Sequence, residues 1–352
     1  MRWTLRYVIP FGLAALLAVV GTRPVAEACS RVLWNDSGRS VLVGRNMDWK
    51  EDLKSNFWLL PRRMKRDGLA PKNSLTWTSK YGSLAVTAYD SVTVDGVNEK
   101  GLGVHTLYLK GTKTGPRDEK VPGMSVSVWA QYYLDNFATV KEAVEALKTQ
   151  PYQLLMIIEP TSGAAGEIHI AMNDATGDSA VLECIEGEIK VYHSREYTVM
   201  TNEPTFDKQL ENLKQYRGFG GEKRLPGTHE AGDRFVRGAY YIKNMPKPKS
   251  DREAVAALMS VMRNTSAPFG QSDPERPNIS PTIWRTITDL TNGVIYYDGV
   301  LSPQVFWVDT KKLNFDAGET ISKLTIVDNF DLMGEVSGKF EKAEMFKFLK
   351  PN

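Results

Sequence analysis

The first 28 residues constrain this 352-residue chain more than any other segment, because they decide where its folded part begins. Two arginines near the start precede an apolar run over 8–20, which is too short to span a bilayer comfortably. The tripeptide AEA at 26–28 then offers an A-x-A cleavage site. A basic start, a short apolar run and such a site are typical of a secretory signal peptide. We therefore expect cleavage after Ala28 and a periplasmic or secreted protein.

Cleavage at that point would make Cys29 the first residue of the mature chain. Its thiolate is a nucleophile, and its free α-amino group, with a pKa of about 7.7–8.0, can accept or donate a proton near neutral pH. One residue would then supply the nucleophile and the base that other enzymes build from two side chains. Two alternatives remain open. Cys29 could carry a lipid in a non-catalytic, membrane-anchored binding protein, although Glu27 fits a lipoprotein signal poorly, or it could form a structural disulfide with Cys184.

Composition argues against several classes of function. The chain has 44 Lys and Arg residues against 42 Asp and Glu, and removal of the leader takes away three arginines and one glutamate, which leaves no net charge. Nothing therefore suggests a nucleic-acid partner or a basic membrane-binding surface. No second apolar run is long enough to cross a membrane, so we expect no stable membrane insertion. Two cysteines are too few for a disulfide scaffold, and Cys184 shares one face of an alternating strand with Ala180 and Leu182, as a buried structural thiol would.

The rest of the chain alternates between runs of predicted strands and groups of predicted helices, which indicates an α+β fold. The segment 94–103 reads as a cluster of turn residues. The best linker candidate, 247–250, joins two predicted helices, so we expect one domain over 29–352. We expect strands at 29–34, 40–46, 75–81, 83–89, 104–110, 167–174, 179–187, 188–194, 288–299 and 303–309, and helices at 125–137, 139–150, 232–245 and 251–264.

A nucleophilic Cys29 would need a cation to favour its thiolate and a carboxylate to orient its amine. Arg45, near the end of the second strand of the first predicted hairpin, and Asp48, just beyond it, offer both charges. None of the four histidines lies in a Cys/His signature. The chemistry therefore points to a base other than imidazole, and it requires no metal or organic cofactor.

Several segments together resemble the choloylglycine hydrolase family of N-terminal-nucleophile cysteine amidases, which includes penicillin V acylases and bile salt hydrolases. They occur in the family's order and span most of the mature chain. Besides Cys29, the matching segments are GRNMD at 44–48, DGVNEKGLG at 95–103, ATGDSAVLE at 175–183, TNEPTFDKQ at 201–209 and LPGTHEAGDRFVR at 225–237.

The resemblance implies a four-layer αββα sandwich and hydrolysis of linear amides. It implies that Cys29 is the nucleophile, with its own amine as base, that Arg45 lies against the sulfur and that Asp48 binds the α-amino group. It also implies that Asn202 holds the oxyanion or the intermediate and that Arg234 completes the polar network.

Two aromatic residues favour the signal-bearing penicillin V acylases within this family. Tyr108 stands where the bile salt hydrolases carry asparagine, and its phenol, or a nearby backbone N–H, would help to stabilise the oxyanion. Trp49 would contact an aromatic or fatty acyl group. We expect a small amide substrate with an apolar acyl group, such as penicillin V or a long-chain acyl-homoserine lactone. Bile salt hydrolysis is the alternative. The short segment between Asn202 and Arg234 leaves a homo-oligomer open but lacks an insertion that forms tetramer contacts in other members.

Overall fold

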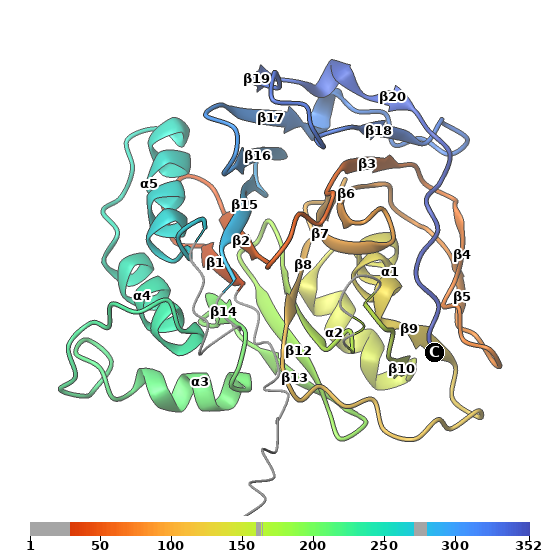
Figure 1. Cartoon of the computed structure of the whole chain (residues 1–352), viewed down its shortest axis with the longest axis horizontal. Helices are drawn as coiled ribbons and strands as arrows, with labels where there is room; N and C mark the ends of the chain where they lie inside the picture. Colours follow the sequence, from red (N-terminus) through yellow and green to blue (C-terminus); the bar gives the residue numbers. More distant parts are fainter. Residues whose placement is uncertain (1–28, 160–162, 164, 271–279) are drawn as a thin grey trace, which may run out of the picture.

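The computed structural model describes residues 29–159, 163, 165–270 and 280–352, so the expected signal peptide, 1–28, lies outside the described residues. Two β-sheets stack face to face, and helices cover the outer face of each sheet (Figure 1). This arrangement is the four-layer αββα sandwich that the family resemblance implied, and it confirms the α+β class predicted from the pattern of strands and helices.

The first sheet contains the strands that flank Cys29. The predicted hairpin is confirmed, since β1 and β2 pair antiparallel with Ser30 opposite Asn46. Side chains alternate between the two faces of a strand, so Arg45 and Met47 face the second sheet while Asn46 and Asp48 face the helices. The strand order is β14 (Val199–Thr201), β1 (Ser30–Trp34), β2 (Leu42–Asp48), β15 (Thr282–Asp289), β16 (Val294–Gly299), β17 (Val305–Asp309) and β19 (Gly334–Glu335).

The second sheet is the larger one. Its order is β13 (Glu188–His193), β12 (Ser179–Ile185), β11 (Ile168–Asn173), β8 (Gly103–Tyr108), β7 (Val92–Asn98), β6 (Ser83–Ala88), β3 (Phe57–Leu60), β18 (Ser322–Leu324) and β20 (Glu341–Lys342). Two small sheets pair β9 (Gly123–Ser125) with β10 (Gln153–Leu155) and β4 (Lys65–Asp67) with β5 (Thr76–Thr78).

The predicted turn cluster at 94–103 is wrong over half of its length, because β7 continues to Asn98. Asp95 and Asn98 favour turns in isolation, but here both are buried and hydrogen-bonded. Asp95 binds His105 and Thr286, and the amide of Asn98 donates to the carbonyls at the end of the neighbouring helix. These partners remove the cost of burying polar side chains in a strand.

The helices divide between the two outer faces. The predicted helices are confirmed with small shifts at their ends. The helix that begins at Val140 is capped by Thr139, whose side chain accepts from the backbone N–H of Glu142. The helix α3 was not predicted. The helices on the side of the first sheet are α3 (Phe206–Leu213), α4 (Ala231–Asn244) and α5 (Asp251–Asn264). The helices on the second sheet are α1 (Trp129–Asn136) and α2 (Val140–Thr149). The short 3₁₀ helices are η1 (Val126–Val128), η2 (Thr310–Lys312) and η3 (Ser337–Lys339).

Close approach between α5 and the first sheet depends on Gly44. A side chain there would collide with Met262 of α5, so only glycine lets the helix lie directly on β2. On the other side of the molecule, Cys184 is buried on the helix-facing side of β12, as predicted. Cys29 and Cys184 are both free thiols, so the structure does not contain the alternative disulfide.

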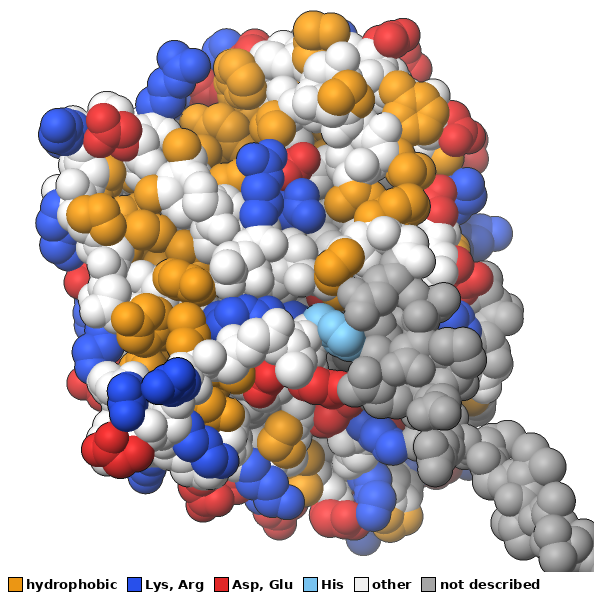
Figure 2. Space-filling view, turned by 60° about the vertical axis from the view of Figure 1, so that its left-hand side comes forward, with side chains coloured by type: hydrophobic (Ala, Val, Ile, Leu, Met, Phe, Trp, Pro, Cys, Tyr) orange, Lys and Arg blue, Asp and Glu red, His pale blue; other side chains and the backbone are white. Residues whose placement is uncertain are grey.

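Charges of both signs are interspersed over the face that carries the first helix layer (Figure 2). Within the described part of the chain, none of the helices is long and apolar enough to cross a bilayer. The same residues contain no cluster of three or more His, Cys, Asp or Glu side chains that could hold a metal ion.

Candidate active site

Cys29 lies directly before β1 with its sulfur between the two sheets. Only 2% of the residue is exposed. The Sγ atom lies 3.8 Å from Met47 Sδ and 3.7 Å from the carbonyl oxygen of Asp48, both at the end of β2. The hairpin register therefore holds the thiol against the end of the neighbouring strand.

Two distant side chains hold the main chain of Cys29 from either side. Its backbone nitrogen donates to Asn202 Oδ1, and its carbonyl oxygen accepts from Arg234 Nη1 at 2.6 Å. In the full-length chain this nitrogen belongs to the peptide bond with Ala28. The contact with Asn202 therefore marks the place that an α-amino group would occupy once that bond is cut.

Arg234 lies at the centre of the polar contacts around Cys29. It projects from α4, is completely buried, and donates from Nη1 to Ser30 Oγ at 2.5 Å and from Nη2 to Asn202 Oδ1 at 3.4 Å. Its Nη1 also lies 3.5 Å from Asp48 Oδ2. One guanidinium thus ties together the strand that begins at Cys29, the asparagine after β14 and the carboxylate at the end of β2.

Asp48 is fully buried and accepts a hydrogen bond from Thr282 Oγ1 of β15. Burial raises the pKa of this carboxyl to about 6, while Arg234, the Thr282 hydroxyl and Arg45 oppose the rise. The group therefore titrates close to neutral pH, and its carboxylate form lies within the network that surrounds the nitrogen of Cys29.

Arg45 is the cation that faces the sulfur from within the layer between the sheets. Nη2 donates to the carbonyl oxygen of Thr106 at 2.7 Å, and the guanidinium carbon lies 4.7 Å from the ring centroid of Trp284. Nε and Nη1 are buried and have no hydrogen-bond partner among the described residues. Burial raises the pKa of the Cys29 thiol to about 11, and Arg45 is the largest influence that opposes this rise.

The structure places the Tyr108 phenol away from the layer between the sheets. Its hydroxyl donates to Glu167 Oε2 at 2.6 Å, and alternation along β8 sends its side chain to the opposite face from Leu107, which packs between the sheets. Its main chain instead turns toward the site, because its carbonyl oxygen accepts from Asn202 Nδ2 at 2.8 Å. Because the N–H of a residue in a strand points to the same side as its carbonyl, the N–H of Tyr108 also points toward Asn202.

Trp49 follows Asp48, is half-buried, and packs against the apolar cluster that contains Cys29. Its backbone N–H donates to the carbonyl oxygen of Pro281 at 3.1 Å. Its indole nitrogen is buried without a hydrogen-bond partner among the described residues. Trp49 therefore lies next to the polar network, and its indole N–H is available to donate a hydrogen bond to a bound molecule.

The structure brings together Cys29, Arg45, Asp48, Asn202 and Arg234 as predicted, and it adds residues that the sequence reasoning missed. Thr282 binds the carboxyl group of Asp48, and Trp284 stacks on the guanidinium of Arg45. Both lie on β15, whose alternating stretch TIWRTITD is a strand signal that could have been found. Nothing in the local sequence, however, places this strand beside β2.

The sequence profile described as "Linear amide C-N hydrolases, choloylglycine hydrolase family" matches residues 29–323, beginning at Cys29. The chain belongs to the choloylglycine hydrolase family. It is therefore a hydrolase of linear amide C–N bonds, as predicted.

Individual members show the same relationship. The chain is 40% identical over 359 aligned residues to a penicillin V acylase of Pectobacterium atrosepticum, with 95% of each chain covered. The structure of a penicillin V acylase from Agrobacterium tumefaciens matches with a TM-score of 0.83 at 40% identity, covering 91% of this chain and 99% of that one. A bile salt hydrolase/transferase of Clostridium perfringens is 28% identical, over 79% of this chain and 91% of that protein.

Proposed function

We propose that this family member is a periplasmic or secreted, penicillin V acylase-like amidase whose nucleophile is the N-terminal Cys29 of the mature chain. The observation that carries the proposal is the hydrogen bond from the nitrogen of Cys29 to Asn202, inside the network that Arg234 and Asp48 complete. The similarity to penicillin V acylases supports the substrate class. Residues 29–352 would act as one amidase domain without a metal or organic cofactor.

In the uncut chain the site would be latent. The peptide nitrogen of Cys29 cannot act as a base, and the buried thiol has a pKa of about 11, so it stays protonated at neutral pH. Cleavage after Ala28 would create an amine at the same place. The amine would take the thiol proton, and the resulting thiolate and ammonium would be stabilised by Arg45 and Asp48 respectively.

Catalysis would begin with attack of the Cys29 thiolate on the carbonyl carbon of the substrate amide. The electron pair of the C=O bond moves to oxygen, and the tetrahedral oxyanion collapses when the C–N bond breaks. The departing nitrogen takes the proton from the α-ammonium group, and the acyl group remains on sulfur as a thioester. Water then attacks the thioester, the α-amine accepts a proton from it, and the carboxylic acid leaves as the C–S bond breaks.

We infer that the oxyanion is stabilised by Asn202 Nδ2 and the backbone N–H of Tyr108. One Nδ2 hydrogen of Asn202 is directed to the carbonyl oxygen of Tyr108, and an amide carries a second hydrogen that can serve the oxyanion. The N–H of Tyr108 points to the same side of β8 as that carbonyl. Two donors aimed at one point are what a developing oxyanion requires.

A lipid-anchored binding protein is a poorer account of Cys29. The sulfur is buried between the sheets, 3.8 Å from Met47 Sδ, where a glyceryl thioether would have to displace packed side chains. Membrane fractionation of the exported protein tests this alternative, because an anchored protein would remain with the membranes.

The substrate class is tested by hydrolysis of penicillin V, a long-chain acyl-homoserine lactone and glycocholate side by side. The Cys29→Ser variant is the control for background hydrolysis. We expect kcat/KM for penicillin V or the lactone to exceed that for glycocholate, since Trp49 and the apolar cluster around it suit an aromatic or fatty acyl group. A clear preference for glycocholate would make the protein a bile salt hydrolase, which the similarity to the Clostridium perfringens protein keeps as the alternative.

A further inference from the structure

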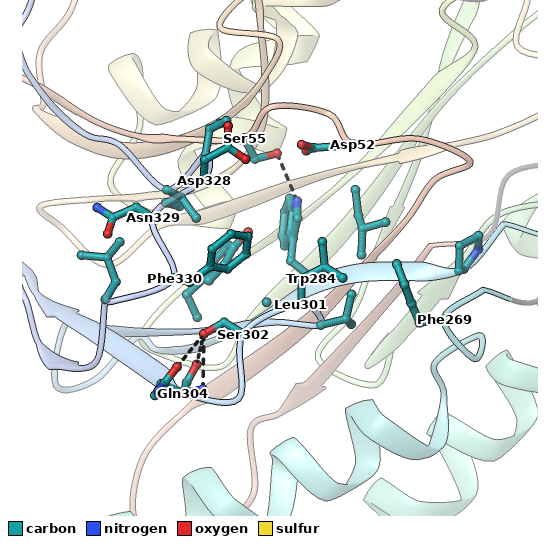
Figure 3. Close-up of a pocket in the computed structure, with 18 of the residues that line it drawn as sticks. Asp52, Ser55, Phe269, Trp284, Leu301, Ser302, Gln304, Asp328, Asn329 and Phe330 are labelled. Carbon is teal, nitrogen blue, oxygen red and sulfur yellow. Dashed lines mark hydrogen bonds between the residues drawn. The ribbon is translucent and has the colours of Figure 1, made fainter.

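A cavity whose lining includes none of Cys29, Arg45, Asp48, Asn202 and Arg234 lies at the end of the sandwich where β15, β16 and β17 meet the loop after β2 and the segment after β18 (Figure 3). Its volume is about 690 Å³. Its floor consists of the aromatic rings of Trp284, Tyr297 and Phe306, which contact one another with centroids 5.6 Å and 5.0 Å apart. Small-molecule sites have volumes of roughly 300–1,000 Å³ and mostly apolar walls, so both size and lining fit a ligand.

Large apolar side chains are exposed at the mouth of this cavity. Phe269 is 57% exposed, Leu301 64% and Phe330 51%, and all three line the cavity. Figure 3 shows these residues and Trp284 around one hollow. A soluble protein rarely exposes neighbouring large apolar residues unless they bind something.

The charges around the mouth restrict what that ligand can be. Glu51, Asp52 and Asp328 are lining residues, and Lys50 is the basic one among them. Asp52 also pairs with Lys54 at 2.9 Å. With Lys54 counted, three carboxylates face two ammonium groups at the rim, an excess that disfavours an anion. The apolar walls and floor favour an uncharged ligand.

Packed side chains separate this cavity from the sulfur of Cys29. Met47 and Trp284 occupy paired positions on β2 and β15, and both are buried. Cys29 lies just before β1, with its sulfur 3.8 Å from Met47 Sδ. Trp284 is also fixed by a hydrogen bond from its indole nitrogen to Ser55 Oγ at 3.1 Å. A ligand on the cavity floor would therefore touch Trp284 without reaching the nucleophile.

We propose that this cavity is a second ligand site, distinct from the one at Cys29, and that it binds an uncharged amphiphile with an aromatic or long aliphatic body. The apolar body packs on the floor formed by Trp284, Tyr297 and Phe306. The polar end faces the rim, where Ser302 and Gln304 offer hydrogen-bonding groups. This site does not depend on the proposed substrate of the enzyme.

Two probes that differ by one charge test the proposal in the mature protein. N-phenyl-1-naphthylamine is uncharged, and 1-anilinonaphthalene-8-sulfonate adds a sulfonate to the same rings. We expect the neutral probe to bind at least about tenfold more tightly than the sulfonated probe. We also expect Leu301→Asp to weaken binding of the neutral probe about tenfold relative to the unsubstituted protein, because a charge at the mouth must be desolvated when the probe binds. Val191→Asp is the matched control, since Val191 is an exposed apolar residue on β13 outside the cavity.

Blocking the nucleophile distinguishes this site from the catalytic one. Binding of the neutral probe should persist after Cys29 is alkylated with N-ethylmaleimide, and an uncharged long-chain acyl-homoserine lactone should displace it from the alkylated protein. Loss of probe binding on alkylation would place the probe at the catalytic site and overturn the proposal. Equal affinity for both probes, or equal effects of Leu301→Asp and Val191→Asp, would also overturn it. Amide hydrolysis by Leu301→Asp separately reports whether the proposed activity is intact.

Discussion

Arg234→Gln should damage the site in a way that no other buried arginine of α4 can. The guanidinium donates to the carbonyl oxygen of Cys29 at 2.6 Å and to that of His229 at 2.8 Å, and it faces the carboxyl group of Asp48. Glutamine cannot make all of these contacts and carries no charge. Removal of one partner of a buried ion pair costs about 3–5 kcal/mol, so we expect the free energy of unfolding to fall by about this amount.

The same substitution should change the pH dependence of hydrolysis. Burial has already raised the pKa of Asp48 to about 6, and Arg234 is the strongest influence that holds it down. Without the guanidinium the pKa rises further, so a larger fraction of Asp48 is protonated at pH 7 and cannot pair with an ammonium group. The acid limb of kcat/KM should therefore move to higher pH.

Arg237→Gln is the matched control for this experiment. Arg237 lies one turn further along α4 and is also buried, but its guanidinium donates to main-chain carbonyls of Asn264 and Thr228 and not to the network around Cys29. It should lose stability in chemical denaturation while its acid limb stays at the wild-type pH. If Arg234→Gln left the acid limb unmoved, or if both variants shifted it equally, the assignment of Arg234 to the Asp48 network would be refuted.

Three further substitutions test the remaining parts of the site. Cys29→Ser should lower kcat by about 10³-fold or more without a change in thermal unfolding, and near-normal turnover would end its assignment as nucleophile. In the wild-type enzyme, kcat/KM should fall on the acid side, because Asp48 must be ionised. The limb should lie at or below about pH 6, because burial raises the pKa of Asp48 to about 6 in the uncut chain and the α-ammonium group of the mature chain lowers it again. Asp48→Asn should abolish this limb along with most activity; an unchanged limb in that variant would assign it to another group. Tyr108→Phe should change kcat by less than about fivefold, because the hydroxyl binds Glu167, whereas a 10²–10³-fold loss, as expected for an oxyanion donor, would show that the phenol takes part.

The sequence predicted local parts of the site well. Side chains alternate between the two faces of the first hairpin, and the position of its turn sets the register of β1 against β2. These two features determine which residues of 44–48 share a face with Cys29, and they place Arg45 close to Cys29.

The rest of the site depends on contacts between distant parts of the chain. Asn202 and Arg234 reach Cys29 across 173 and 205 positions of sequence, and only the resemblance to a known family connected them beforehand. The direction of the Tyr108 phenol was not predictable, because the face of β8 toward which it points depends on pairing with β11. Asp95 was read as a turn residue because its partners, His105 and Thr286, lie on other strands.

The most direct test of the account is mass spectrometry of the exported enzyme, quenched in acid during turnover of penicillin V and then digested. We predict a peptide whose first residue is Cys29 and whose sulfur carries the phenoxyacetyl group, together with an unmodified form of the same peptide before substrate is added. An active enzyme whose chain still continues upstream of Cys29, or whose acyl group is attached to another residue, would contradict the claim that one cut uncovers both the nucleophile and its base.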